Sequence, residues 1–113
     1  MHELALIEDL CSSASQAARR QGARRIHRLQ LRLGDRCGVD PEALRQAFAV
    51  MTEWPEWAET QLDLEVVPTR CFCPHCRQPF APADVIHACP RCGSLSRQVL
   101  SGRELELVAL EVS

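Results

Sequence analysis

The chain has 113 residues and a mass of 12.7 kDa, enough for one small domain or for one domain with a metal-stabilised lobe. Hydrophobic residues make up 46% and charged residues 25%, with a net charge of −2, which is ordinary for a globular protein. All thirteen basic residues are arginines, and without lysine the chain is neither a standard P-loop NTPase nor a Schiff-base enzyme.

The first half of the chain alternates between helical and strand patterns. Residues 2–20 place apolar side chains at intervals of three and four, which predicts an amphipathic helix. Residues 24–33 alternate leucine with arginine or glutamine, which predicts a half-buried strand. Asp40-Pro41-Glu42 is typical of a capped helix start, so we expect a second helix there, which Pro55 ends.

The Trp54-Pro55-Glu56-Trp57 segment holds both tryptophans of the chain. Such a segment either covers the edge of a sheet or forms a contact surface for another molecule. Of these two roles, we favour packing.

The second half contains two more strong strand signals. Residues 60–67 alternate apolar and polar side chains, and residues 104–112 form the last predicted strand. Apolar residues fall on both faces in the C-terminal half of that strand, which indicates cover on both sides or a β-bulge. A short strand is also expected at Val99 and Leu100.

These elements predict an α+β fold in which two helices pack on one face of a small three-stranded sheet, with an inserted zinc-ribbon lobe. The ribbon is expected at residues 69–101. The rest of the fold, residues 1–68 plus 102–113, is expected to form one α/β domain.

The ribbon prediction depends on two Cys-x-x-Cys pairs, Cys73-Pro74-His75-Cys76 and Cys89-Pro90-Arg91-Cys92. Four thiolates fill a closed tetrahedral zinc site, so we predict that Cys73, Cys76, Cys89 and Cys92 bind structural Zn²⁺. Gly93 follows the second pair and suits a left-handed turn. Arg77 stands at the matching place after the first pair, so a strained turn is expected there.

Other uses of these cysteines stay open, namely two disulfides, an iron–sulfur centre or a redox dithiol. Seven cysteines, an odd number, fit a reducing cytosol better than a disulfide framework. Four cysteines already complete a zinc site, so we expect His75 and His87 on the surface or beside the ligands. Cys71 is expected to be a spectator thiol.

The chain lacks the signals of export. No apolar run reaches the length of a membrane span, and acidic residues stand near the N-terminus where a signal peptide has basic ones. Together with the cysteine pattern, this predicts a cytoplasmic protein.

A second metal site is conceivable at Met1-His2-Glu3. The α-amine, the next backbone nitrogen and the His2 imidazole can chelate a metal in one plane, and Glu3 can complete the set. A planar nitrogen donor set suits Ni(II) or Cu(II) rather than zinc. On these residues alone, a surface histidine is the commoner interpretation. Asp40 is expected to cap its helix, with possible service as an extra oxygen ligand.

Five motifs occur along the chain in a distinctive order. They are Met1-His2-Glu3-Leu4, Gly34-Asp35-Arg36, Asp40-Pro41-Glu42-Ala43-Leu44, the paired Cys-x-x-Cys motifs, and Ser101-Gly102-x-Glu104-Leu105. Over essentially its full length, the chain resembles the HypA/HybF family, nickel metallochaperones for the maturation of nickel–iron hydrogenase.

The resemblance implies that nickel binds Met1, His2 and Glu3, in a domain of residues 1–68 plus 102–113, while zinc is structural. It implies a maturation factor and not an enzyme. The implied partners are the GTPase HypB, which would supply nucleotide hydrolysis, and the hydrogenase large-subunit precursor. Some members also serve urease. The segment with the two tryptophans departs from the family pattern, so the chain is expected to be either a monomer or a homodimer.

A zinc-ribbon module that binds nucleic acid is the alternative function. Residues 70–97 have a local charge of +3, and residues 19–36 hold seven arginines against Asp35. The net charge is negative, however, and the ribbon lacks the clustered aromatic residues on which bases stack, so we expect neither nucleic-acid nor membrane binding. A thiol oxidoreductase is a third option, against which tight zinc occupancy would count.

Overall fold

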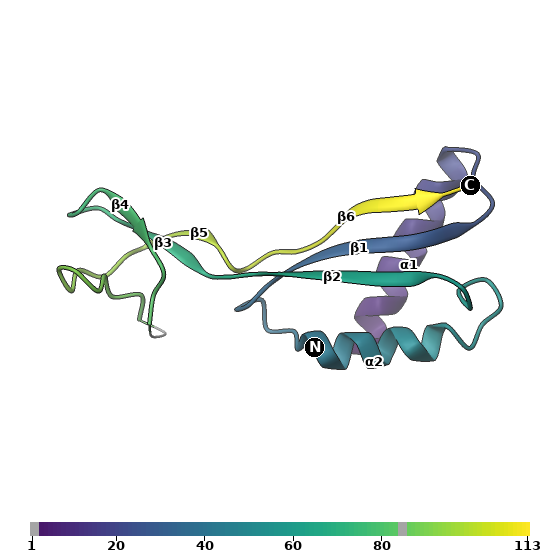
Figure 1. Ribbon diagram of the computed structural model, residues 1–113, viewed down its shortest axis with the longest axis horizontal. Helices are drawn as coiled ribbons and strands as arrows, with labels where there is room; N and C mark the ends of the chain where they lie inside the picture. Colours follow the sequence, from purple (N-terminus) through teal and green to yellow (C-terminus); the bar gives the residue numbers. More distant parts are fainter. Residues whose placement is uncertain (1–2, 84–85) are drawn as a thin grey trace.

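The protein has two lobes arranged end to end. The computed structural model describes residues 3–83 and 86–113, and it measures 54 × 26 × 17 Å (Figure 1). The helix–sheet lobe contains α1 (Glu3–Arg20), α2 (Pro41–Met51) and a three-stranded sheet. The ribbon contains a second three-stranded sheet and the paired cysteines. Neither helix combines the length and the apolar character that crossing a membrane requires, within the residues described.

The sheet of the helix–sheet lobe has the strand order β2-β1-β6. Its strands are β1 (Ile26–Gly34), β2 (Gln61–Val67) and β6 (Leu105–Val112). β1 is parallel to β2, and α2 provides the crossover that a parallel pair needs, whereas β6 is antiparallel to β1. Both helices lie on one side of this sheet (Figure 1). The predicted α+β arrangement, with the ribbon inserted between β2 and β6, is confirmed.

The core lies between the helices and the central strand. Leu29, Leu31 and Leu33 alternate along β1 and are at most 1% exposed, as their period-two spacing predicts. They meet buried side chains of both helices, namely Ile7, Cys11, Ala14, Ala18, Leu44, Ala47 and Phe48. Burial of each leucine stabilises the fold by about 2 kcal/mol. The amphipathic pattern of residues 2–20 is thus confirmed for the described part, Glu3–Arg20.

Cys11 behaves as a small apolar side chain in this core. It is 2% exposed, and burial, followed by the charges of Glu56 and Glu8, raises its pKa to about 11. The thiol therefore stays protonated and unreactive at neutral pH.

A β-bulge in β6 explains why apolar residues fall on both faces of its sequence. Gln30 pairs with Ala109, but Leu31 pairs with Leu107, so Val108 is an extra residue in the ladder. Leu105, Leu107 and Leu110 consequently pack on the core. The bulge shifts the alternation by one residue, which leaves Ala109 exposed. The bulge, one of the two predicted explanations, is confirmed.

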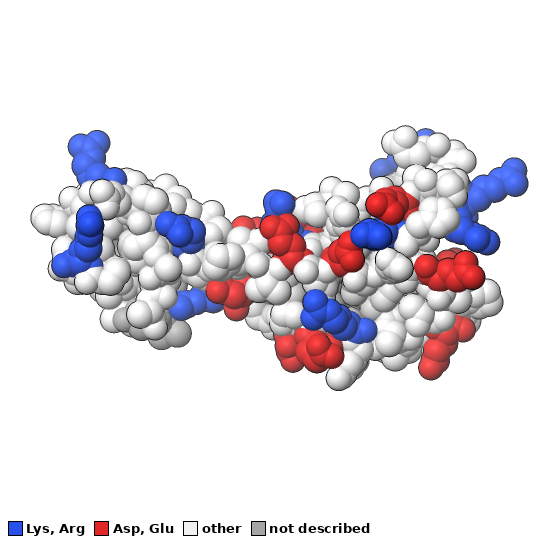
Figure 2. Space-filling model, in the orientation of Figure 1, with Lys and Arg blue, Asp and Glu red and all other residues white. Residues whose placement is uncertain are grey.

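The opposite face of the sheet carries a ladder of ion pairs. Each arginine of β1 lies between an acid of β2 and an acid of β6, the four pairs being Arg28–Asp63 (2.9 Å), Arg28–Glu111 (3.6 Å), Arg32–Glu65 (3.3 Å) and Arg32–Glu106 (3.5 Å). Acidic and basic side chains accordingly alternate over this lobe in Figure 2. Because these charges compensate each other, Arg28 and Arg32 do not contribute to a uniformly basic nucleic-acid surface.

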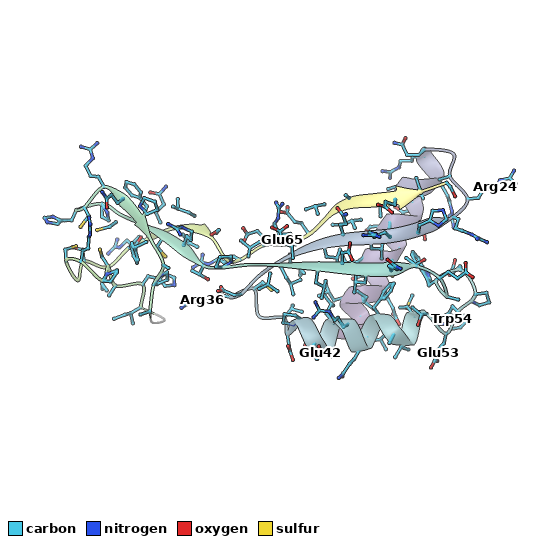
Figure 3. The ribbon with its side chains drawn as sticks, viewed as in Figure 1. Arg24, Arg36, Glu42, Glu53, Trp54 and Glu65 are labelled. Carbon is cyan, nitrogen blue, oxygen red and sulfur yellow. The ribbon has the colours of Figure 1, made fainter. Side chains whose placement is uncertain are left out.

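The two tryptophans have different environments. Trp57 is 3% exposed and belongs to the core, as expected from packing. Trp54 is 62% exposed and lies beyond the end of α2 (Figure 3), so the expectation of packing is wrong for this residue. A single turn separates them, in which Trp57 N–H donates to the Trp54 carbonyl.

The ribbon is an antiparallel sheet of order β4-β3-β5 with a core of its own. The strands are β3 (Arg70–Cys73), β4 (Gln78–Phe80) and β5 (Gln98–Ser101). Its buried hydrophobic residues are Cys71, Cys73, Phe80 and Cys89. The sequence predicted only the last strand, because three or four residues rich in cysteine and proline show no clear alternation.

Candidate metal centres

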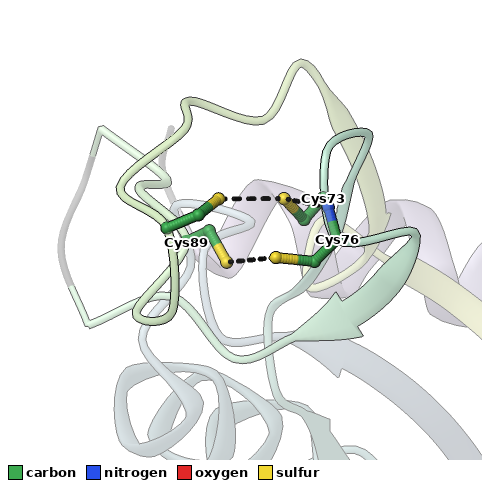
Figure 4. A group of neighbouring side chains, drawn as sticks. Cys73, Cys76 and Cys89 are labelled. Atoms are coloured by element: carbon green, nitrogen blue, oxygen red, sulfur yellow. Dashed lines mark hydrogen bonds between the residues drawn. The ribbon is translucent and has the colours of Figure 1, made fainter.

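The ribbon brings the four predicted zinc ligands together at one end. Cys73 ends β3, Cys76 lies in the turn before β4, and Cys89 and Cys92 come from the loop that precedes β5 (Figure 4). The four sulfur atoms all lie within 4.8 Å of one another. Cys73 Sγ is 3.6 Å from Cys92 Sγ, and Cys76 Sγ is 4.0 Å from Cys89 Sγ.

These distances fit a tetrahedral metal site and no disulfide. Zn–S bonds of about 2.3 Å in a regular tetrahedron place the sulfur atoms about 3.8 Å apart. A disulfide needs about 2.05 Å, and all seven cysteines are free. Soft thiolate ligands in this geometry suit zinc, and they also suit an iron–sulfur centre.

The two Cys-x-x-Cys turns share one backbone conformation. Arg77 N–H donates to the Cys73 carbonyl and Gly93 N–H to the Cys89 carbonyl, each over 2.8 Å. Both residues have positive φ, 57° at Arg77 and 74° at Gly93. The predicted strain at Arg77 is confirmed, because a residue with a Cβ pays an energetic penalty in this region that glycine avoids. The first turn also directs Cys76 N–H to Cys73 Sγ, at 3.3 Å.

We expect Arg77→Gly to be more stable than Arg77→Ala by about 1 kcal/mol, because glycine removes the left-handed strain and alanine keeps it. Both variants lose the same guanidinium charge, so their difference isolates the backbone effect. Thermal unfolding of the zinc-loaded proteins measures it, and equal stability of the two variants would contradict a strained turn.

The electrostatics of the sulfur cluster favour a bound cation. Hydrogen bonds from Ser94 lower the pKa of Cys92 to about 6, whereas the hydrogen bond with Cys92, followed by burial, raises the pKa of Cys76 to about 12. Cys92 and Cys76 therefore do not ionise together without a positive charge between them. Outside the cluster, the described charged residues of the ribbon are all arginines, and this lobe shows only basic colour in Figure 2.

The remaining candidate side chains of the ribbon do not join the cluster. His75 is exposed and His87 is half-buried, and neither belongs to the group of four sulfurs among the described residues. Cys71 is fully buried and pairs across the sheet with Phe80 and Val99. Its thiol is thus a core side chain, as the spectator role predicts.

The candidate nickel residues are only partly covered by the structure. Met1 and His2 lie outside the described residues. Glu3 opens α1 and is half-buried, and Figure 1 shows that α1 begins on the side of the lobe where α2 lies. Asp40 caps α2 as predicted, because its Oδ1 accepts from Glu42 N–H at 3.1 Å.

The chain matches a family model over residues 1–112, described as hydrogenase/urease nickel incorporation, metallochaperone, hypA. It is 44% identical to the hydrogenase maturation factor HypA of Picosynechococcus sp., over 99% of both chains. It is also 41% identical to HypA of Chloroflexus aggregans, over 98% of both chains.

Solved structures agree with these sequence matches. The solution structure of the Ni metallochaperone HypA from Helicobacter pylori superposes with a TM-score of 0.66 at 25% identity, covering 99% of this chain and 97% of that one. A second solution structure of a HypA protein gives a TM-score of 0.68 at 26% identity, covering 100% and 97%.

Proposed function

Since the chain belongs to the HypA family of metallochaperones for nickel incorporation into hydrogenase and urease, we propose that it binds Ni(II) at its amino terminus and delivers it for hydrogenase maturation. The family consists of maturation factors, not enzymes. The observation that carries the proposal is the family match from residue 1 to residue 112, which includes the Met1-His2-Glu3 start.

The amino terminus has the chemistry that a transferable nickel ion requires. The α-amine and the His2 imidazole supply nitrogen donors, with the backbone nitrogen between them and Glu3 as a further ligand, in the planar arrangement that Ni(II) accepts. An open site of this kind exchanges ligands readily, whereas a closed tetrathiolate would retain the ion. Cargo and structural metal therefore need separate sites.

The structural metal of this proposal is zinc, held by Cys73, Cys76, Cys89 and Cys92 in a ribbon domain of residues 69–101. Bound zinc would neutralise the thiolates and stabilise the ribbon, whose own hydrophobic core is small. The nickel-binding domain comprises residues 1–68 plus 102–113.

The partners of this proposal are a HypB-type GTPase and the hydrogenase large-subunit precursor, in the cytoplasm. A lysine-free chain has no P-loop lysine to place on a nucleotide phosphate, so a separate protein must supply nucleotide hydrolysis if delivery needs it. Urease maturation is a second destination that the family description includes.

Equilibrium dialysis against Ni(II) tests the amino-terminal site. The native protein is compared with a protein whose α-amine is acetylated, which removes this nitrogen from the donor set. We expect acetylation to abolish nickel binding while zinc content stays at one ion per chain. Equal nickel uptake by both proteins would disprove the amino-terminal site.

A further inference from the structure

The helix–sheet lobe and the ribbon meet at a junction of three chain segments. Two of them, residues 67–69 and residues 101–104, are the covalent linkers between the lobes, and the third is the turn 34–36 at the end of β1. The turn belongs to the helix–sheet lobe alone. Figure 3 places Arg36 of this turn at the narrow waist between the lobes. The lobes have separate hydrophobic cores, so their relative orientation is not set by a shared core.

The turn is bonded to both linkers through its backbone. Three N–H groups donate to linker carbonyls, Gly34 to Glu104 (2.7 Å), Asp35 to Val67 (2.9 Å) and Arg36 to Gly102 (2.8 Å). Each linker is therefore bonded to a turn that belongs to the helix–sheet lobe. These bonds end at Val67, three residues before β3 begins at Arg70, and at Gly102, the residue that follows β5.

The side chain of Asp35 reaches further, to the residue that immediately precedes β3. Its Oδ2 accepts from Thr69 N–H at 3.1 Å, and its Oδ1 accepts from the Thr69 hydroxyl. Thr69 is 5% exposed, so this hydroxyl has little access to water as an alternative partner. The hydroxyl bond lowers the pKa of Asp35, which keeps the carboxylate ionised and able to accept both bonds at neutral pH.

Two glycines pack against each other and against Thr69 at the same place. A Cβ on Gly34 would overlap the backbone of Gly102, and a Cβ on Gly102 would overlap Thr69. Gly102 also has a φ of 111°, a conformation that residues with a Cβ rarely adopt. The turn and the second linker are consequently in close backbone contact beside Thr69.

We propose that Asp35 and Thr69 are positioning residues, which clasp the ribbon to the turn 34–36 so that both lobes move as one elongated body. Two linkers alone would form a two-stranded hinge, whereas a third point of attachment at the start of β3 removes that freedom. The clasp holds the zinc-binding end of the ribbon at a fixed direction from the helix that begins at Glu3. Its role in presenting nickel rests on the proposed function, but its mechanical role does not.

Residual dipolar couplings of the zinc-loaded, nickel-free protein test the clasp. In the native protein, amides of β1 and of β3 and β5 are expected to fit one alignment tensor. In Thr69→Val, which keeps the branched shape and loses the hydroxyl, we expect two different tensors and a shorter rotational correlation time for the ribbon. Thr69→Ser, which restores a hydroxyl, should return the common tensor.

Two further variants make the result specific. Asp35→Ala removes both acceptor oxygens, so it should separate the tensors as Thr69→Val does. Ser101→Ala removes a 2.8 Å bond from Ser101 Oγ to the Pro68 carbonyl, which joins one linker to the other without reaching the turn. This control should keep one tensor.

The proposal would be overturned by two tensors in the native protein, by one tensor in both Thr69→Val and Asp35→Ala, or by separate tensors in Ser101→Ala. Zinc content of one per chain shows that each variant retains its ribbon. Because no nickel is present, these results do not depend on whether the amino-terminal site exists.

Discussion

Cys73→Ala is expected to strip zinc from the protein and unfold the ribbon, while the helix–sheet lobe stays folded. The reason is the small size of the ribbon core, in which Cys73 and Cys89 are two of the four buried hydrophobic residues. Structural zinc contributes roughly 10–16 kcal/mol to the folding of small zinc modules, far more than such a core can supply. The leucines of β1 belong to the separate core of the other lobe and keep their contacts.

Zinc analysis and amide NMR measure this effect. We expect less than one zinc per chain and collapsed dispersion of the signals from β3, β4 and β5, with the β1 signals retained. Cys71→Ala is the matched control, because it removes a fully buried thiol from the same strand without removing a ligand. It should cost about 1–2 kcal/mol and leave zinc in place. Loss of zinc from the control, or full zinc in Cys73→Ala, would contradict the assigned ligands.

Local sequence patterns predicted those parts of the fold that depend only on residues close together in the sequence. Leu29, Leu31 and Leu33 follow a strict period of two and line the core. Asp40 precedes a proline and caps its helix as expected. The cysteine spacing predicted the sulfur cluster, since a Cys-x-x-Cys turn fixes each pair locally and only the meeting of the two pairs requires the fold.

Features that depend on distant contacts were beyond such patterns. The position of the bulge at Val108 is set by pairing with β1, which the composition of β6 does not encode. Trp54 and Trp57 have similar chemistry and differ only in which side of a turn meets the core. Asp35 and Thr69 are separated by 34 positions, so their contact had no local signal. The Gly34-Asp35-Arg36 motif indicates the family resemblance but carries no signal of this contact.

The second large effect concerns nickel. We expect His2→Gln to weaken Ni(II) binding by more than about 100-fold, because loss of a residue that merely supports a metal ligand already costs 10–100-fold. Glutamine keeps a polar side chain of similar size but lacks the imidazole nitrogen. Isothermal titration with Ni(II) measures the affinity. Zinc content should not change, since the proposed zinc ligands are in the other lobe.

His75→Gln provides the matched control, because His75 is exposed in the ribbon and its loss should leave nickel affinity within about twofold of the native protein. Affinity for nickel should also fall on acidification from about pH 8 to pH 6, as protons compete for the α-amine (pKa about 7.7–8.0) and the imidazole (pKa about 6.5). Equal losses in both histidine variants would place the ion between the lobes or in the ribbon. If the first residues of the chain bind the nickel ion, only His2→Gln should lose nickel affinity. The pH dependence of nickel binding should also disappear in that variant.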